Sequence, residues 1–223
     1  MFFGCTPKGG DLNLPDNSQS ASARPAAVLL SLRSLHADTS SLLFQYEVEN
    51  RTEAPIYIFS LLYKTDPSGT VLADANLVYS FFAEDRVLDF RKALLEVPPW
   101  AFVEAPEEPY LTKIDKGGSF QEIIRVPLPA RCFDPYEENY PPGRQSELIQ
   151  AKGWRFSLGY IAKLAHPEKV EKEIIAGKEY FIVPYAEGMA NQFLLKSNVT
   201  QDQLAVFTPA RMHEREFVKQ SDK

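Results

Sequence analysis

The chain has 223 residues and a formal net charge of −6, and 44% of its residues are hydrophobic while 24% are charged. This length suits one large domain, and the composition is that of a globular protein rather than of a disordered chain or a membrane bundle. Nucleic-acid binding through phosphate neutralisation needs a basic surface, so the acidic charge argues against such a partner. Cys5 and Cys132 lie far apart, so their spacing predicts neither a disulfide framework nor a zinc site.

The first 27 residues are rich in small and polar residues, proline and glycine, so we expect residues 1–27 to form a flexible tether. Two phenylalanines, a glycine and Cys5 precede most of this tether, and this order resembles the end of the lipobox of bacterial lipoproteins. The resemblance implies a lipid anchor at Cys5 in the cell envelope. It requires a translation start further upstream, because residues 1–5 lack the charged and apolar regions of a signal peptide. The alternative is a cytoplasmic protein in which Cys5 is incidental.

From Val28 onward, short apolar or alternating runs are separated by turn residues, which predicts antiparallel strands. The runs cover residues 28–35, 42–50, 56–63, 71–72, 77–82, 119–129, 153–161, 180–183 and 193–195. In the run 42–50, Phe44, Tyr46 and Val48 alternate with polar residues, as in a strand with one buried face.

Other segments are less regular. Residues 84–97 fit both a helix and a strand, and their β-branched and aromatic residues favour a strand. Residues 98–109 and 131–150 are predicted to be surface loops, and residues 166–178 a hairpin or a short helix. The turn at residues 66–69 leads into a short run at Val71, which we expect to lie at a sheet edge.

The number and spacing of these runs predict an all-β fold, an antiparallel β-sandwich that is immunoglobulin-like or Greek-key in outline. We expect the sandwich to occupy residues 28–200. Residues 201–223 are predicted to be a C-terminal tail, in which Thr208 to Lys219 forms a short helix or stays disordered.

The sequence contains none of the motifs that commonly mark a catalytic centre: no G-x-S-x-G, no P-loop and no G-x-G-x-x-G. His213 is followed by a glutamate as in a zinc protease, but Phe217 stands where the second histidine would be. We therefore assign no catalytic residue, no metal ligand and no cofactor. A hydrolase built from carboxylates or histidines of distant strands is the alternative of another class.

Aromatic, acidic and proline residues are mixed in the two predicted loops, and such surfaces suit protein recognition. The candidate binding residues are Trp100, Phe133, Tyr136 and Tyr140. The alternative is that the second loop packs its tyrosines and phenylalanine onto the sandwich. The sequence thus predicts a non-catalytic binding domain for a protein or another macromolecule of the cell envelope, reaching the membrane only through a lipid on Cys5. A cytosolic accessory domain is the competing interpretation.

Overall fold

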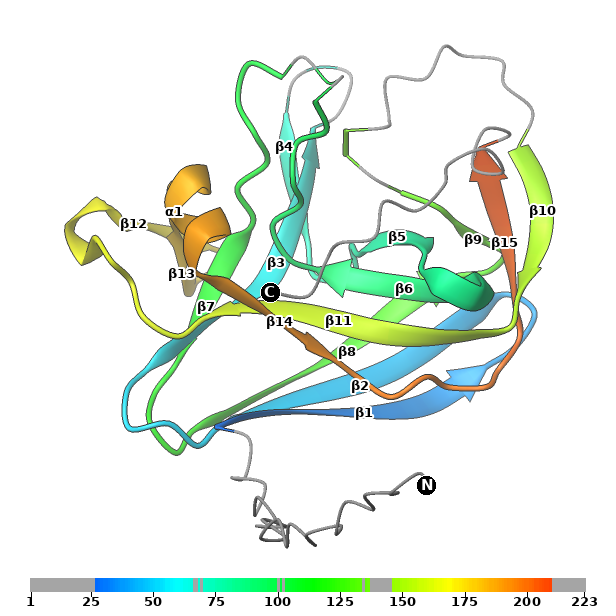
Figure 1. Cartoon of the computed structure of the whole chain (residues 1–223), viewed down its shortest axis with the longest axis horizontal. Helices are drawn as coiled ribbons and strands as arrows, with labels where there is room; N and C mark the ends of the chain where they lie inside the picture. The colour runs from blue at the N-terminus through cyan, green and yellow to red at the C-terminus, as the bar shows by residue number, and fades with distance from the viewer. Residues whose placement is uncertain are drawn as a thin grey trace, which may run out of the picture.

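Strands make up most of the regular structure, and the predicted all-β sandwich is confirmed (Figure 1). The structure is a computed structural model that describes residues 27–65, 68, 70–99, 101, 103–133, 135, 136 and 146–209. The strands are β1 (Val28–Ala37), β2 (Ser41–Asn50), β3 (Ile56–Thr65), β4 (Val71–Asp74), β5 (Tyr79–Phe82), β6 (Val87–Lys92), β7 (Tyr110–Ile114), β8 (Ser119–Pro127), β9 (Ala130–Arg131), β10 (Ser146–Ala151), β11 (Gly153–Ile161), β12 (Glu171–Ile175), β13 (Lys178–Ile182), β14 (Gln192–Lys196) and β15 (Leu204–Pro209). The helical segments are η1 (Glu84–Arg86), η2 (Pro167–Lys169) and α1 (Tyr185–Asn191).

The strands form three sheets. One is an antiparallel 3-stranded sheet in the order β1-β2-β8, and a second joins β10, β15 and β9. The largest is a 9-stranded sheet with the order β12-β13-β7-β3-β11-β6-β5, in which β14 pairs with β11 and β4 with β3. Figure 1 shows α1 and the β12–β13 hairpin at one end of the molecule and β10 with β15 at the other.

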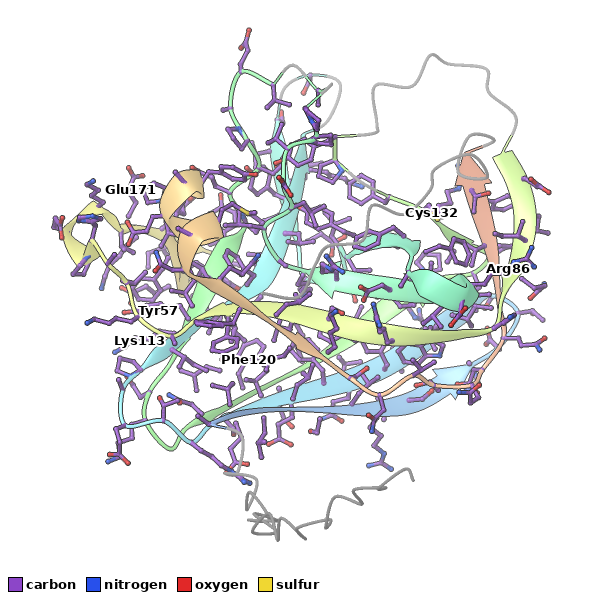
Figure 2. All side chains as sticks on the ribbon, viewed as in Figure 1. Tyr57, Arg86, Lys113, Phe120, Cys132 and Glu171 are labelled. Atoms are coloured by element: carbon purple, nitrogen blue, oxygen red, sulfur yellow. The ribbon has the colours of Figure 1, made fainter. Side chains whose placement is uncertain are left out.

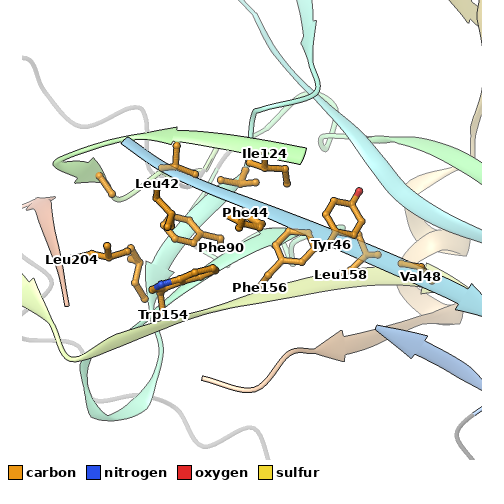
Figure 3. Close-up of a cluster of buried hydrophobic side chains, with 14 of the residues drawn as sticks. Leu42, Phe44, Tyr46, Val48, Phe90, Ile124, Trp154, Phe156, Leu158 and Leu204 are labelled. Carbon is orange, nitrogen blue, oxygen red and sulfur yellow. The ribbon is translucent and has the colours of Figure 1, made fainter. Parts of the chain in front are cut away.

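The main core lies between the β1-β2-β8 sheet and the central strands of the largest sheet (Figure 3). Phe44, Tyr46 and Val48 on β2 are fully buried there, as the alternation of the run 42–50 predicts. The ring of Phe44 lies 5.1 Å from that of Trp154 and 5.4 Å from that of Phe156, both on β11. Offset and tilted ring pairs at these distances add to the burial of apolar area, so this cluster holds the two layers together.

Two further expectations on strands are confirmed. The ambiguous segment from residue 84 contains strand β6, preceded by the single turn η1. Strand β4 pairs only with β3 among the described strands, and 51% of the Val71 surface is exposed, as expected of an edge. The β-sandwich is confirmed but its immunoglobulin-like outline is not, and two strand pairs, β6 with β11 and β9 with β15, are parallel.

The structure corrects the expected course of the chain in two places. Residues 204–209 belong to strand β15, not to a tail, and residues 146–150, assigned to a loop, belong to strand β10. These two strands pair with each other antiparallel over their whole lengths. Each segment alone is short and weakly patterned, and only this long-range pairing makes it a strand. Thr208 lies in β15, so the expected helical or disordered segment does not start there. Residues 210–219 lie outside the described residues, and the expectation for them stays a prediction.

The turn between β1 and β2 is built around the carboxylate of Asp38. Its Oδ1 accepts hydrogen bonds from the Ser40 and Ser41 backbone N–H groups at 2.7 and 2.8 Å, and its Oδ2 lies 2.9 Å from Nε2 of His36. These hydrogen bonds, that of His36 first, hold the pKa of Asp38 well below its usual range. The ionised carboxylate therefore stabilises the folded protein at neutral pH.

Because of this turn, the free energy of unfolding is expected to fall at low pH. Because the pKa of Asp38 is lower in the folded than in the unfolded state, its contribution is present above about pH 4 and is lost as the pH falls further. In urea unfolding at pH 7 and pH 3, Asp38→Asn is expected to lose less stability on acidification than the wild type. His36→Ala should raise the titration midpoint of Asp38, followed by carboxyl ¹³C NMR. Equal acid sensitivity of Asp38→Asn and wild type would contradict this account.

Candidate functional site

A groove of about 490 Å³ lies between the end of β8, the turn from β4 to β5 and the chain around β9. This volume is within the range of about 300–1,000 Å³ that is usual for ligand sites. The apolar part of its lining consists of Leu77, Val78, Val126, Pro127, Pro129 and Phe133. Cys132, labelled in Figure 2, is half-buried next to Phe133 and marks this part of the fold.

The turn between β4 and β5 forms one wall of the groove and is fixed to β8. The backbone N–H of Asn76 donates to Oδ1 of Asp74 at 2.8 Å, which closes the turn on itself. Oδ1 of Asn76 then accepts the backbone N–H of Arg125 on β8 at 2.9 Å. Strand β8 forms the second wall, so the Asn76 side chain holds the two walls together.

Phe133 is placed in the groove by pairing with strand β5. Its backbone N–H donates to the carbonyl of Ser80 at 2.8 Å, and the Ser80 N–H donates back to the Phe133 carbonyl at 2.9 Å. The Ser80 hydroxyl donates to the carbonyl of Arg131 at 2.6 Å. The Phe133 ring lies 5.9 Å from that of Tyr79. The backbone at Phe133 is thus paired with strand β5.

The charged part of the lining is mostly positive. Arg125 and Arg131 are both exposed, and neither guanidinium makes an ion pair with any residue that the structure describes. Arg131 lies over the ring of Phe207, 5.6 Å from its centroid, which restricts its position. Asp74 is the only carboxylate among the described residues of the lining. The groove therefore combines apolar walls with two cations that a carboxylate of a ligand can meet.

A buried lysine joins the turn between β4 and β5 to strand β8. The side chain of Lys92 has no exposed surface, and its ammonium donates to the carbonyls of Ser60 and Ala75 at 2.6 and 2.7 Å and to Oε2 of Glu122 at 2.6 Å. Ala75 belongs to the turn of the first wall, and Glu122 belongs to β8. The hydroxyl of Tyr46 also donates to Glu122, at 2.9 Å. This network joins the two walls through the core.

Burial shifts the pKa values of Lys92 and Tyr46 in this network. Loss of water lowers the pKa of Lys92, and the negative charge of Glu122 acts in the opposite direction. Burial, and then the charge of Glu122, raises the pKa of Tyr46. The three N–H donors of the ammonium are matched by three acceptors, so all of them are satisfied within the protein. Lys92 therefore positions the turn between β4 and β5 against β8.

The structure separates the candidate residues of the sequence. Phe133 lines the groove, whereas Tyr136 is only 4% exposed and its hydroxyl oxygen accepts the backbone N–H of Glu107 at 3.2 Å. Tyr136 therefore packs onto the domain, as in the alternative weighed for this loop, and direct contact of its ring with a partner is not supported. Trp100, Tyr140 and Cys5 lie outside the described residues, so binding through the two aromatic residues and lipid attachment at Cys5 stay predictions.

Sequence reasoning missed the charged residues of the groove. Arg125 and Arg131 were read only as parts of a strand and a loop. For Lys92 a signal existed, because the alternation of strand β6 places it on the same face as Leu88 and Phe90, which are both buried. A lysine on an apolar face indicates a buried ion pair, but its partner on β8 cannot be read from the sequence.

Among the residues described, no group of three or more histidine, cysteine, aspartate or glutamate side chains is arranged to hold a metal ion. His36 and His166 are exposed and each contacts a nearby carboxylate. No described helix has the length and apolar character needed to cross a bilayer. No known family model, curated protein or solved structure matches the chain.

Proposed function

We propose that this protein is a non-catalytic binding domain whose groove holds an extended segment of a protein partner. The observation that carries the proposal is the combination, in one groove, of apolar walls with the guanidinium groups of Arg125 and Arg131, which make no ion pair with the described residues. Apolar walls favour an aliphatic or aromatic side chain of the partner, and the arginines favour a carboxylate beside it. The partner segment is therefore apolar and acidic.

The pre-formed walls support binding of this kind. Two sets of hydrogen bonds fix the walls without a ligand: that from Arg125 to Asn76 and those of Lys92. Because the walls are already ordered, little conformational entropy is lost when a ligand enters. The proposal includes a place at the cell envelope through a lipid on Cys5. That part is supported by the resemblance of the N-terminal residues to a lipobox alone.

Two synthetic peptides test the groove. Both are acetylated hexapeptides with a central Leu-Phe pair, flanked by glutamates in one and by lysines in the other. In ¹H–¹⁵N spectra of the wild type, the glutamate peptide is expected to shift the backbone amides of Asn76, Arg125 and Phe133 saturably, and the lysine peptide is not. Arg125→Glu is expected to raise the dissociation constant of the glutamate peptide at least about tenfold, since a charge-assisted contact is lost and a repulsive one is created.

The matched control is Arg33→Glu. Arg33 is also an exposed strand arginine without an ion pair among the described residues, but it lies on β1 and does not line the groove. Both variants change the net charge equally, so general electrostatic attraction affects them alike. Equal losses in the two variants, or equal shifts with both peptides, would refute an acidic ligand in this groove.

A further inference from the structure

A second polar site lies on the outward face of β6 and β11, where two arginines meet one buried aspartate. Asp89 has no exposed surface. Its Oδ2 lies 2.6 Å from Nη2 of Arg91 and 3.5 Å from Nη2 of Arg155. Its Oδ1 accepts the hydroxyl of Ser157 at 2.6 Å. Both arginines therefore share one carboxylate oxygen, and the other oxygen is occupied by a neutral donor.

The strand register brings these four residues together. Strands β6 and β11 run parallel, with Arg155 opposite Asp89 and Ser157 opposite Arg91. The neighbouring residues along each strand, such as Phe90 and Phe156, point into the core, so these four side chains share the opposite face. Arg86, labelled in Figure 2, stands immediately before β6 and marks the end of the strand nearest Asp89.

The arginines carry donors that the described protein leaves unused. The Nε atoms of Arg91 and Arg155 are both buried and have no hydrogen-bond acceptor. Each arginine side chain as a whole remains about one-fifth exposed, at 21% and 22%. The guanidinium of Arg91 is held over the ring of Phe81, 4.4 Å from its centroid. Buried polar groups are nearly always satisfied, so these two donors on adjacent arginines are available to an acceptor that the described residues do not supply.

The charges at this face point to the kind of acceptor. The carboxylate of Asp89 offsets one guanidinium, so one positive charge is left. Lys196 on β14 lies directly opposite Ser157 and is exposed, which adds another. The face is thus positive although the whole chain carries a net charge of −6. A neutral ligand would leave this charge uncompensated.

We propose that Arg91 and Arg155 together bind an oxyanion group, a phosphate or a carboxylate, on the outward face of β6 and β11. The planar guanidinium presents paired N–H donors that match two oxygens of such a group, and two guanidinium groups fixed on adjacent strands grip it from both sides. Asp89 orients both arginines from beneath. None of these residues lines the groove, so this site does not depend on the proposed function.

The test follows the arginine Nε–Hε signals of the wild type in ¹H–¹⁵N spectra at constant ionic strength. Inorganic phosphate is added in one series and acetate in another, with sodium chloride as the reference. We expect the signals of Arg91 and Arg155 to shift saturably with at least one of the two anions and not with chloride. Saturation with phosphate alone identifies a phosphate-bearing ligand, and saturation with acetate alone identifies a carboxylate.

Arg51 is the internal control. It also donates to one carboxylate two residues away, that of Glu49 at 2.7 Å, but no second arginine among the described residues joins that pair. Arg155→Gln is expected to weaken anion binding at least about tenfold, since one of two charge-assisted contacts is lost, while Arg51→Gln leaves it unchanged. Arg155 is replaced rather than Arg91 because Arg91 makes the shorter contact to Asp89, so its loss would disturb the fold more. The titration of the wild type tests the site even if the variant does not fold. Absence of saturable shifts, or shifts of Arg51 equal to those of the pair, would overturn the proposal.

Discussion

Replacement of Lys92 by methionine is expected to lower the free energy of unfolding by about 3–5 kcal/mol, because it breaks a buried ion pair by removing one partner. Of the contacts that the described residues make with the Glu122 carboxylate, the hydrogen bond from the Tyr46 hydroxyl remains, and the one from the ammonium is lost. The carbonyls of Ser60 and Ala75 lose their donor as well. Urea unfolding followed by fluorescence measures the loss.

The same experiment contains its own controls. Lys172→Met removes an exposed ion pair with Glu179 at 3.0 Å and is expected to cost less than about 1 kcal/mol. In the double variant Lys92→Met, Glu122→Gln, the isolated charge is gone and Tyr46 still has an acceptor, so part of the stability should return. If Lys92→Met costs no more than Lys172→Met, the buried pair does not brace the fold.

Truncation of Phe44 to alanine is expected to cost about 3–5 kcal/mol, because it opens a cavity at the centre of the main core. The ring is fully buried and lies within 5.1 to 6.1 Å of the rings of Phe90, Trp154 and Phe156. These three residues belong to the opposite layer, so their contacts with Phe44 join the two sheets. Thermal unfolding by calorimetry, compared at the wild-type midpoint, measures the effect.

Phe193→Ala is the matched control for this prediction. Phe193 is a strand phenylalanine that also contacts an aromatic ring, that of Tyr160 at 5.4 Å, but 56% of its surface is exposed. Its truncation should cost about 1 kcal/mol, the range of one aromatic pair. Phe44→Leu should fall between the two, since it leaves a smaller cavity. Equal losses at both phenylalanines would mean that the layers are not held together at Phe44.

Local alternation accounts for the strands that sequence reasoning found. In β2, Phe44, Tyr46 and Val48 are buried and their polar neighbours face outward, which is the side-chain period of a strand. Alternation also located β11, whereas a continuous apolar run predicted β3, a glycine turn and two prolines bounded the run that became β8, and a tight turn preceded the edge strand β4. All of these signals are local in the sequence.

Helix α1 was missed for the opposite reason. It has only 7 residues and contains Gly188, so its good helix formers, Ala186, Glu187, Met189 and Ala190, are too few to predict a helix. Gly188 lies against Leu94, and a Cβ there would come within 2.3 Å of the leucine Cδ1. The helix exists because it covers this end of the largest sheet, which is a tertiary contact.

The candidate groove was only half visible in the sequence. The mixture of aromatic and acidic residues after Cys132 directed attention to Phe133, which does line the groove. Arg125 and Arg131 joined it only through the fold, because the turn before β5 lies far from the consecutive strands β8 and β9 along the chain. Pairing of Phe133 with Ser80 and capping of Arg125 by Asn76 bring them to one place.

The chain alone therefore specifies the all-β class, most of the strands and their buried faces, because hydrophobic periodicity is a local property that burial on one side imposes. The pairing of β10 with β15, the parallel pairing of β6 with β11 and the partners of Lys92 and Asp89 were decided in three dimensions. They depend on which strands become neighbours, and the free energy that selects neighbours comes from contacts between residues far apart in the sequence. Both proposed binding sites arise from such contacts.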